Sequence, residues 1–523
     1  MRKIYIFFSN DKVTTKAKEK MADIILFDSA RKGGTGKSKI AVSGAVMIAQ
    51  NYGKTLLVEA DFTNPNYFSI YSNQNVKSRF IRYGEKGKEQ LISEKEQASR
   101  EKEGLEEKLK KKKRAKAIDN LERKIIEKGH SINDMEHAIK EIEKLEKKDS
   151  YCWFKDNLDY IIKRKKNRDK INDEIKDRIM LQLRTEKNYL NGAEIEIEAE
   201  RIIEEEVAKA TMQSGVFKPH IEDYILNTKI IDLDILMGKK NQNDLLNDLI
   251  YENRSALKED AANAENLLKD DFITSLENLS QKYKNIVIDG YAGHDYMTDK
   301  LFELSNKHVI IAENNEASAK SVYNNMYETI NKIFESMINK NSAAASAIAS
   351  KFNIPMNNKT GLEVYKEIAQ RAKEINAQII RYESKKRGNE EIFEGEEGIY
   401  TSFSKFRYEL SSLIEESDKK IDELASLCIV MNKIVPDFFG KQRGLAIENY
   451  NRMKKGLERY GIKALTPGFE KNYGGGIIYF YKNLSCIEDK KSAPMAYAKP
   501  RHDFSIQIKN LVNFIKAEDY LKN

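Results

Sequence analysis

Residues Asp23 to Ser38 read DIILFDSARKGGTGKS, and this stretch decides the fold. Its apolar first part, Asp23–Asp28, leads into a glycine-rich loop, and a helical pattern, IAVSGAVMIAQNY, begins at Ile40. A strand, a glycine-rich loop and a helix in this order are typical of a phosphate-binding loop. The sequence therefore predicts a P-loop nucleotide site near the start of the chain.

The loop contains the residue types that hold a phosphate group. Glycines let backbone N–H groups face the phosphates without a Cβ atom in the way, and the start of the helix adds a favourable dipole. Lys37 is expected to reach the β- and γ-phosphates, and the Ser38 hydroxyl to bind Mg²⁺. The predicted cofactor-binding residues here are Gly33, Gly34, Thr35, Gly36, Lys37, Ser38 and Lys39.

The order of the loop residues resembles the deviant Walker A motif of the ParA/MinD ATPases. Arg31 stands where the usual motif has its first glycine, and Lys32 directly precedes the double glycine. In that family a lysine at the position of Lys32 reaches the phosphates across a nucleotide-sandwich dimer. The resemblance implies ATP and Mg²⁺ as cofactors, an ATP-dependent homodimer, and Lys32 and Lys37 as catalytic residues. Lys39 departs from the family, which usually has a second hydroxyl residue there.

Two acidic segments are similar to further motifs of that family. Leu56–Asp61 (LLVEAD) resembles its second motif, in which Glu59 and Asp61 occupy the places of the two acids. By this resemblance Asp61 is catalytic and positions the attacking water or the magnesium shell. Tyr283–Gly290 (YKNIVIDG) is an apolar stretch that ends in Asp289, where a carboxylate would hold magnesium through water.

Weaker likenesses continue toward the end of the chain. Cys428–Lys433 resembles the strand whose final asparagine reads adenine, which implies that role for Asn432. Pro467 resembles the proline that flanks the base. Both residues are ordinary at strand ends, so their assignment to the cofactor rests on the resemblance alone.

Seven short apolar runs are predicted to be strands, and helical patterns follow most of them. Their near-continuous hydrophobicity is typical of strands buried on both faces of a parallel sheet. The alternation of strands and helices predicts a doubly wound, mostly parallel α/β fold of the P-loop NTPase class. The runs are Asp23–Asp28, Thr55–Ala60, Ile231–Met237, Asn285–Asp289, His308–Ala312, Leu427–Met431 and Ile462–Leu465. The apolar part of residues 1–12 is read as another strand rather than as a signal peptide.

The α/β domain is expected in three pieces, residues 1–79, 214–337 and 421–523. A helical insertion at residues 80–213 and a smaller one at residues 338–420 separate them. About half of residues 81–210 are charged, 33 basic and 31 acidic. Steps of three and four residues predict a coiled-coil hairpin, with breaks at Gly129-His130-Ser131, Asp149-Ser150 and Asn191-Gly192. Its apolar seam is Ile118, Leu121, Ile125, Ile132, Met135, Ile139 and Ile142.

Three surfaces have both a functional and a structural interpretation. Two basic clusters in the long insertion could grip phosphates of non-specific DNA, although a solvated helix face explains them as well. Tyr151, Trp153 and Phe154 could form a partner-binding tip, or pack within the hairpin. The helix Ile506–Leu521 could bind a membrane, but core packing of its apolar face is favoured. The basic clusters are Lys108, Lys110–Lys113, Arg114 and Lys116, and Lys163–Lys166 with Arg168.

Related classes of ATPase fit less well. ABC-type ATPases with long coiled coils need a glutamate directly after the Walker B aspartate, whereas Gly290 follows Asp289 here. Bacterial tyrosine kinases lack the lysine before the double glycine and have a tail of clustered tyrosines. The arsenite-pump and tail-anchored-protein ATPases usually have two nucleotide domains or a cysteine pair. This sequence has Lys32 before its double glycine, and it has no tyrosine-clustered tail, no second nucleotide domain and no cysteine pair.

The leading functional hypothesis is a slow, ATP-driven dimerisation switch like ParA, which positions or segregates DNA or a large cargo. One alternative is a membrane-associated regulator like MinD. Another is an interaction protein that recruits an unknown protein partner through its helical insertion. No apolar run approaches the roughly 20 residues of a membrane span, so a cytoplasmic location is expected. The net charge of +8 over 523 residues permits DNA or membrane contact without arguing for either.

Overall fold

The structure is a computed structural model, and it describes most of the chain. Predictions that fall on other residues, such as the strand expected within residues 1–12, lie outside the described part. The described residues are 22–29, 36–61, 87–110, 115–146, 149–187, 192–228, 230–238, 242–257, 263–290, 296–356, 359–388, 391–415, 417–434, 441–468, 476–479, 496, 499–517 and 520.

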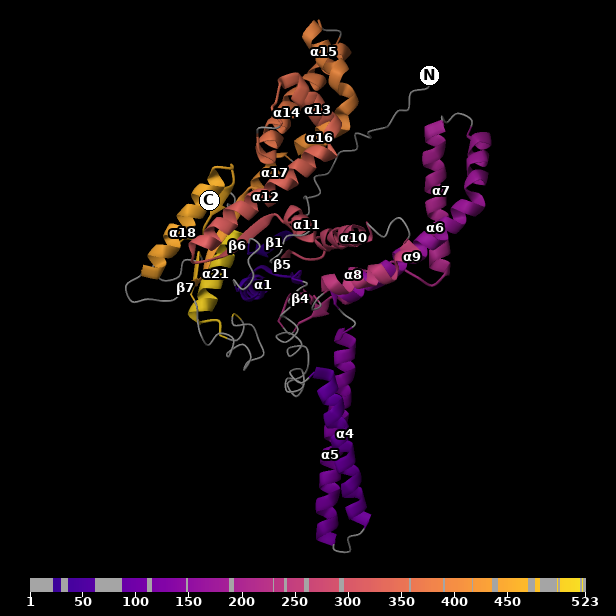
Figure 1. Ribbon diagram of the computed structural model, residues 1–523, viewed down its shortest axis with the longest axis vertical. Coiled ribbons are helices and arrows are strands. Elements are labelled where there is room, and N and C mark those ends of the chain that lie inside the picture. Colours follow the sequence, from indigo (N-terminus) through magenta and orange to yellow (C-terminus); the bar gives the residue numbers. More distant parts are fainter. Residues whose placement is uncertain are drawn as a thin grey trace.

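Nine strands of the described chain form one mixed, mostly parallel sheet (Figure 1). Its order is β3-β4-β2-β5-β1-β6-β7-β8, and β9 also pairs with β7. The pairing of β3 with β4 is antiparallel, and the other printed pairings are parallel. The strands are β1 (Asp23–Asp28), β2 (Thr55–Glu59), β3 (Leu226–Asn227), β4 (Leu233–Leu236), β5 (Asn285–Asp289), β6 (Lys307–Glu313), β7 (Ser426–Ile434), β8 (Lys463–Leu465) and β9 (Ile477–Tyr479).

The seven predicted strands are confirmed, and two of them, β1 and β5, have the predicted bounds. The other five differ at their ends by one to three residues. The short strands β3 and β9 were not predicted, because runs of two and three residues carry too little pattern to be recognised. The α/β class and the mostly parallel sheet are therefore established.

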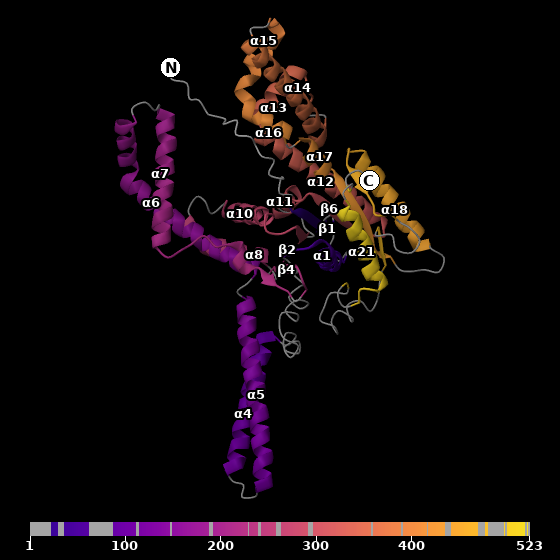
Figure 2. The same ribbon diagram turned by 180° about the vertical axis from the view of Figure 1, so that it is seen from behind.

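Helices cover both faces of the sheet, as expected for strands that are apolar on both sides (Figures 1 and 2). Along β1, Ile25 and Phe27 pack on the face covered by α1 and α21, whereas Ile24 and Leu26 pack on the face of α10, α11, α12 and α18. This alternation gives two hydrophobic cores, one on each side of the sheet. The covering helices are α1 (Lys37–Tyr52), α10 (Ala264–Leu279), α11 (Tyr296–Leu304), α12 (Glu316–Lys340), α18 (Lys441–Glu458) and α21 (Asp503–Lys516).

The last helix, α21, belongs to the core. Its apolar residues Ile508, Leu511, Val512 and Ile515 are at most 1% exposed. The core-packing interpretation of this face is therefore confirmed, and the membrane-binding interpretation is wrong, because the face is already covered.

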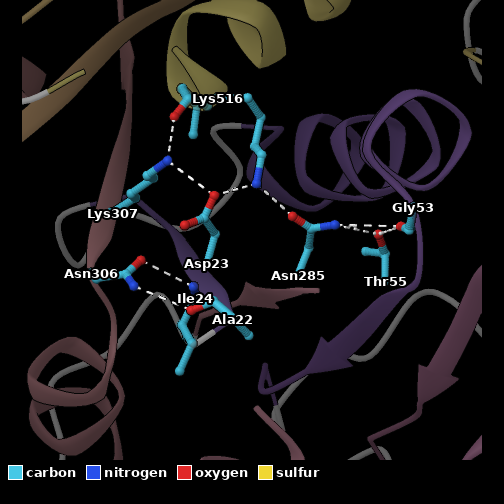
Figure 3. A network of polar contacts seen from close by, with 10 residues as sticks. Ala22, Asp23, Ile24, Gly53, Thr55, Asn285, Asn306, Lys307 and Lys516 are labelled. Carbon is cyan, nitrogen blue, oxygen red and sulfur yellow. Dashed lines mark hydrogen bonds and ion pairs between the residues drawn. The ribbon is translucent and has the colours of Figure 1, made fainter. Parts of the chain in front are cut away.

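An ion network joins α21 to the amino ends of β1, β5 and β6 (Figure 3). The Asp23 carboxylate accepts hydrogen bonds from Lys307 and Lys516, and Lys516 also donates to Asn285 Oδ1 at 2.6 Å. Lys307 Nζ donates to the carbonyl oxygen of Ile515 at 2.7 Å. Burial acts to raise the pKa of Asp23, but the two lysines outweigh it and hold the pKa below its usual value.

The first helical arm is an antiparallel pair, α4 (Gly87–Lys110) and α5 (Ala115–Glu146), which projects away from the sheet (Figures 1 and 2). Lys128 pairs with Glu101 and Lys95 with Glu136, so residues late in α5 meet residues early in α4. The predicted break at Gly129-His130-Ser131 is wrong, because α5 runs through it without interruption. A single glycine costs a helix only about 1 kcal/mol, which the neighbouring helix can offset.

The second arm consists of α6 (Ser150–Glu186) and α7 (Gly192–Gln213). The predicted break at Asp149-Ser150 is confirmed, since the Asp149 side chain caps α6 by accepting the Cys152 N–H at 2.7 Å. Helix α7 begins at Gly192, next to the third predicted break.

The base of α6 is part of the main core. Trp153 and Phe154 are 0% and 1% exposed and pack against Phe272 of α10, with ring centroids 5.7 and 5.2 Å apart. The idea of a partner-binding tip is therefore wrong for Trp153 and Phe154, whose rings are covered by the main core. Packing within the hairpin does not account for them either, because the contact is with α10.

The remaining helices complete the described part of the molecule. Helix α12 leaves the sheet and continues into a small helical unit, as expected for the smaller insertion, and the longest helix of this unit is α14. The small unit contains α13 (Ser342–Phe352), α14 (Gly361–Gly388), α15 (Glu394–Phe403), a 3-10 turn (Ser404–Phe406), α16 (Arg407–Glu415) and α17 (Ser417–Leu424). Beside the base of α6 lie a 3-10 turn (Ile221–Tyr224), α8 (Gln242–Glu252) and α9 (Arg254–Leu257). Within the described residues, no helix is long and apolar enough to cross a membrane.

Candidate functional site

The carboxyl ends of β2, β5 and β1 meet the first turn of α1 in the middle of the sheet. Strand β1 pairs with β5 on one side and with β6 on the other. In open α/β sheets, ligands bind outside the carboxyl ends of the strands, at the point where the strand order reverses. The described residues Gly36 to Lys39, and the acids predicted from the two acidic segments, lie at this point.

Lys37 is the central residue of the site. It is only 4% exposed, and its ammonium group donates to Asp289 Oδ1 and to the carbonyl oxygen of Gly290. The same Nζ atom lies 3.9 Å from Asp61 Oδ2. A buried ammonium group is costly unless it is paired. The partners of Lys37 are the two carboxylates that the sequence analysis assigned to magnesium and to water.

Carboxylates outnumber cations at this edge among the described residues. Asp28, Glu59 and Asp289 are at most 3% exposed, and Asp61 retains 15% of its side-chain exposure. Glu59 and Asp289 are register partners on β2 and β5. The donor set of carboxylate and hydroxyl oxygens suits Mg²⁺.

Gly36 ends the loop in a conformation that favours glycine. Its φ of 81° and ψ of 14° lie in the left-handed region. A Cβ atom at Gly36 would stand 2.7 Å from Asn432 Nδ2. The structure therefore brings Asn432, near the carboxyl end of β7, beside Gly36, although the two residues are far apart in the sequence.

Gly290 allows β1 and β5 to approach closely at the site. Its N–H donates to the carbonyl oxygen of Phe27 at 2.9 Å. A Cβ atom there would stand 2.9 Å from Leu26 Cδ1 and 3.1 Å from the Phe27 oxygen. The glycine after Asp289 thus has a packing reason, and the larger glutamate of the ABC-type motif would not fit.

The first turn of α1 has the charge pattern of an anion site. It has no acidic residue and no side-chain cap, and it carries Lys37 and Lys39 instead. Acidic residues usually stabilise the start of a helix, and cations there oppose its dipole. Two lysines at a helix start are favourable when an anion such as a phosphate binds there. Ser38, the predicted magnesium ligand, lies between them and is partly buried.

Not every predicted residue meets at this site. Lys32, Gly33, Gly34 and Thr35 lie outside the described residues. Pro467 follows β8, which is three strands from β1 in the sheet order, roughly 14 Å at the usual strand spacing. Pro467 therefore lies at the same edge of the sheet as Lys37, but three strands away from β1.

Sequence reasoning missed a group of amide side chains at the ends of β6 and α18. Asn314 Nδ2 donates to the Gln442 carbonyl oxygen at 3.1 Å, and Asn449 Nδ2 donates to Asn314 Oδ1 at 2.9 Å. Asn314 directly follows β6, so its place at the carboxyl edge could have been predicted. Its partners on α18 could not, because their contact depends on how that helix packs.

No protein-family model matches this chain, and no curated protein is significantly similar to it.

Ser38 and Asp289 carry oxygen atoms of the kind that Mg²⁺ binds. In the described residues, no group of three His, Cys, Asp or Glu side chains is arranged to hold a metal by itself. Mg²⁺ commonly binds through one or two carboxylates, several waters and the phosphates of a substrate. Ser38 and Asp289 fit that mode, because Ser38 would supply its hydroxyl oxygen and Asp289 would hold the ion through water.

Proposed function

We propose that this protein is a Mg²⁺-dependent ATPase that works as a slow switch resembling ParA. The observation that carries the proposal is the position of Lys37. Its buried ammonium group stands at the start of α1, between the carboxylates of Asp289 and Asp61. A lysine in this place can exchange a carboxylate partner for a phosphate oxygen with little movement of the backbone.

Each residue of the site has a defined task in this proposal. Lys37 and the backbone of the loop hold the phosphates, and Asp61 orients the attacking water. Bound Mg²⁺ neutralises charge on the phosphates, and Ser38 and Asp289 would hold it, Asp289 through water. Positioning and charge neutralisation account for most of the catalysis of phosphoryl transfer, so this small set of groups is sufficient.

The motif resemblance extends the proposal to dimerisation. Lys32 would reach the phosphates of a second copy, so ATP would assemble a homodimer and hydrolysis would release it. The expected partner of the dimer is non-specific DNA or a large cargo. Two arginines of the basic cluster on α6 already pair within the arm, Arg164 with Glu204 and Arg168 with Glu200. A DNA contact through Arg164 or Arg168 would therefore have to replace or share these ion pairs.

A second function is favoured by the shape of the molecule. Two helical arms project from the α/β sheet, and α4 and α5 pack mainly against each other (Figures 1 and 2). An arm of this kind can recruit a protein partner without changing the nucleotide site. In this alternative, ATP would control when the partner is recruited.

One experiment tests the switch and separates the two functions. Asp61→Ala protein is incubated with Mg-ATP or Mg-ADP, and its binding to random-sequence DNA is followed across a salt series. DNA binding that requires ATP and weakens steeply with salt would support the ParA-like function. Equal and negligible binding in both states would contradict it and favour the recruiting arm.

The arm can then be tested by removing residues 87–146 and measuring capture of partner proteins. This deletion is preferable to removing residues 80–213, since the base of α6 belongs to the main core. Capture that persists without the arm would contradict the recruiting function.

A further inference from the structure

Helix α6 is attached directly to the edge of the sheet that carries the candidate site. The Glu59 carboxylate, at the end of β2, accepts the Gly238 N–H at 3.1 Å. Gly238 follows β4, and the preceding carbonyl oxygen, that of Met237, accepts the Ser150 N–H at 2.8 Å. Ser150 is the first residue of α6. One hydrogen bond to the Glu59 side chain, one peptide unit and one backbone hydrogen bond thus link Glu59 to the second arm.

The start of α6 is also held from its other side. Ser150 Oγ donates to Gln242 Oε1, at the start of α8, at 2.9 Å, and both residues are fully buried. The end of β4 and the start of α8 therefore clamp the first turn of α6. A shift of β4 at Gly238 must be taken up by this turn, because close-packed interiors transmit strain rather than absorb it.

Glu59 lies at the edge of the sheet where a bound nucleotide would add negative charge. It is 1% exposed, stands in register with Asp289, and is two residues from Asp61. ATP and ADP differ by the γ-phosphate, which Lys37, Asp61 and Asp289 are placed to sense. A ligand can bias a conformation only through contacts that differ between its states. Glu59 connects this edge to β4 through the hydrogen bond that it accepts from Gly238.

The rest of α6 can carry a small movement over a long distance. The helix has 37 residues and contains no proline or glycine, and beyond its buried base it extends away from the sheet (Figures 1 and 2). Ion pairs of Arg164 and Arg168 with α7 stiffen the arm. Measured along its axis, the helix is about 50 Å long from Ser150 to Arg184, and it bends between its base and its far end (Figures 1 and 2). A rotation of about 5° at the base would displace the far end by up to about 4 Å.

We propose that Glu59 is a positioning residue that couples the nucleotide site to the α6–α7 arm. Nucleotide exchange shifts the end of β2, the Glu59–Gly238 hydrogen bond passes the shift to β4, and Ser150 passes it to α6. The far end of the arm then differs in position between the ATP and ADP states. This inference rests on the proposed ATPase function and adds its output: the arm reports which nucleotide is bound.

The test measures the arm directly in the full-length protein. Spin labels are placed at Arg184→Cys, at the far end of α6, and at Lys509→Cys, on the exposed side of α21. The native cysteines are replaced by Cys152→Ser, Cys428→Ala and Cys486→Ser. Label-to-label distances are recorded with Mg-ADP and with a non-hydrolysable Mg-ATP analogue, and nucleotide binding is measured on the same samples. We expect the mean distance to differ between the two states by up to about 4 Å, from the lever length given above.

Three variants locate the coupling. Glu59→Leu removes the acceptor at similar volume and should bind nucleotide while losing the distance change, whereas Glu59→Gln retains an acceptor oxygen and should restore it. Gln242→Ala loosens the clamp away from the nucleotide and should reduce the distance change without altering affinity. Asp234→Asn is the matched control, because Asp234 lies on β4 but bonds Tyr283 instead.

The outcomes separate this inference from the proposed function. Nucleotide binding with the same distance in both states would overturn the coupling and leave the ATPase proposal intact. A full distance change in Glu59→Leu would overturn the role of Glu59. Absence of nucleotide binding in the labelled protein and in wild type would overturn both proposals. A melting temperature within a few degrees of wild type is required of each variant before its distances are compared.

Discussion

The ammonium group of Lys37 lies against the carboxylate of Asp289, although 252 positions separate the two in the sequence. Both long arms lie between the two residues along the chain, so the pair forms only when β5 takes its place in the sheet beside β1. Removing one partner of a buried ion pair leaves an uncompensated charge, which typically costs 3–5 kcal/mol. The pair therefore marks the point where the pieces of the α/β fold are joined and where the chemistry is proposed.

Asp61→Ala is expected to separate binding from turnover. The Asp61 side chain faces Lys37 at 3.9 Å and keeps some exposure to solvent, so it can orient a water. We predict near-normal affinity for Mg-ATP and a fall in the single-turnover rate of roughly 100-fold. Stopped-flow measurement of phosphate release checks this, with Asp234→Asn as a control carboxylate. An unchanged rate in Asp61→Ala would remove Asp61 from the mechanism.

Gly36→Ala is expected to damage the loop. An alanine in the left-handed conformation costs about 1–2 kcal/mol, and its Cβ would also stand 2.7 Å from Asn432 Nδ2. We predict lower stability and weaker Mg-ATP binding, measured by denaturant unfolding and by calorimetry. Gly444→Ala is the control, since Gly444 lies in α18 with no atom within 4 Å of an added Cβ. That substitution should stabilise the protein by up to about 1 kcal/mol, and the opposite order of the two variants would contradict the geometry.

Trp153→Ala tests whether the base of the second arm belongs to the core. Trp153 is fully buried against Phe154 and Phe272, so its removal should lower the free energy of unfolding by about 3–5 kcal/mol. Leu181→Ala, farther along α6, should change it by less than about 0.5 kcal/mol, because Leu181 is 67% exposed. Similar effects of the two substitutions in urea unfolding would mean that α6 is not anchored as described.

His308 makes the stability depend on pH. Burial lowers its pKa to about 4, even though the Phe302 and Glu423 carbonyl oxygens, 2.9 and 3.1 Å from its ring nitrogens, favour the charged form. The unfolded chain, with a histidine pKa near 6.5, binds more protons between these two values. The contribution of His308 is therefore complete above about pH 6.5 and is lost as the pH falls toward 4, by about 3 kcal/mol in total.

The measurement is the free energy of unfolding of wild type and His308→Gln at pH 7, 6 and 5. We expect a shallower decline toward low pH in the variant. Parallel curves for the two proteins would show that His308 does not titrate in this window.

Long local patterns could be read from the sequence, and contacts between distant elements could not. Strands such as Asn285–Asp289 were recognisable because a run of buried apolar residues ends in a charged one. The helix that starts at Lys37 was recognisable because an apolar helical pattern follows a run of glycines. The break expected at Gly129 was wrong because packing against α4 overrides a weak local preference.

The burial of Trp153 illustrates the same limit. An aromatic cluster beside a helix start is compatible with a hairpin, a tip or a core, and only the position of α10 decides between them. The neighbourhood of Gly36 and Asn432, and the hydrogen bond from Gly238 to Glu59, depend likewise on the order of strands in the sheet. Sequence spacing carries no signal for these contacts.

The most direct test of the central claim is a calorimetric titration of Mg-ATP into wild type, Lys37→Ala and Lys509→Ala. Lys509 is an exposed lysine on α21 and serves as the matched control for the loss of one positive charge. The proposed site predicts saturable binding to wild type and to Lys509→Ala, and no detectable binding to Lys37→Ala in a protein that remains folded. Wild-type affinity in Lys37→Ala, or no binding to any of the three, would contradict it.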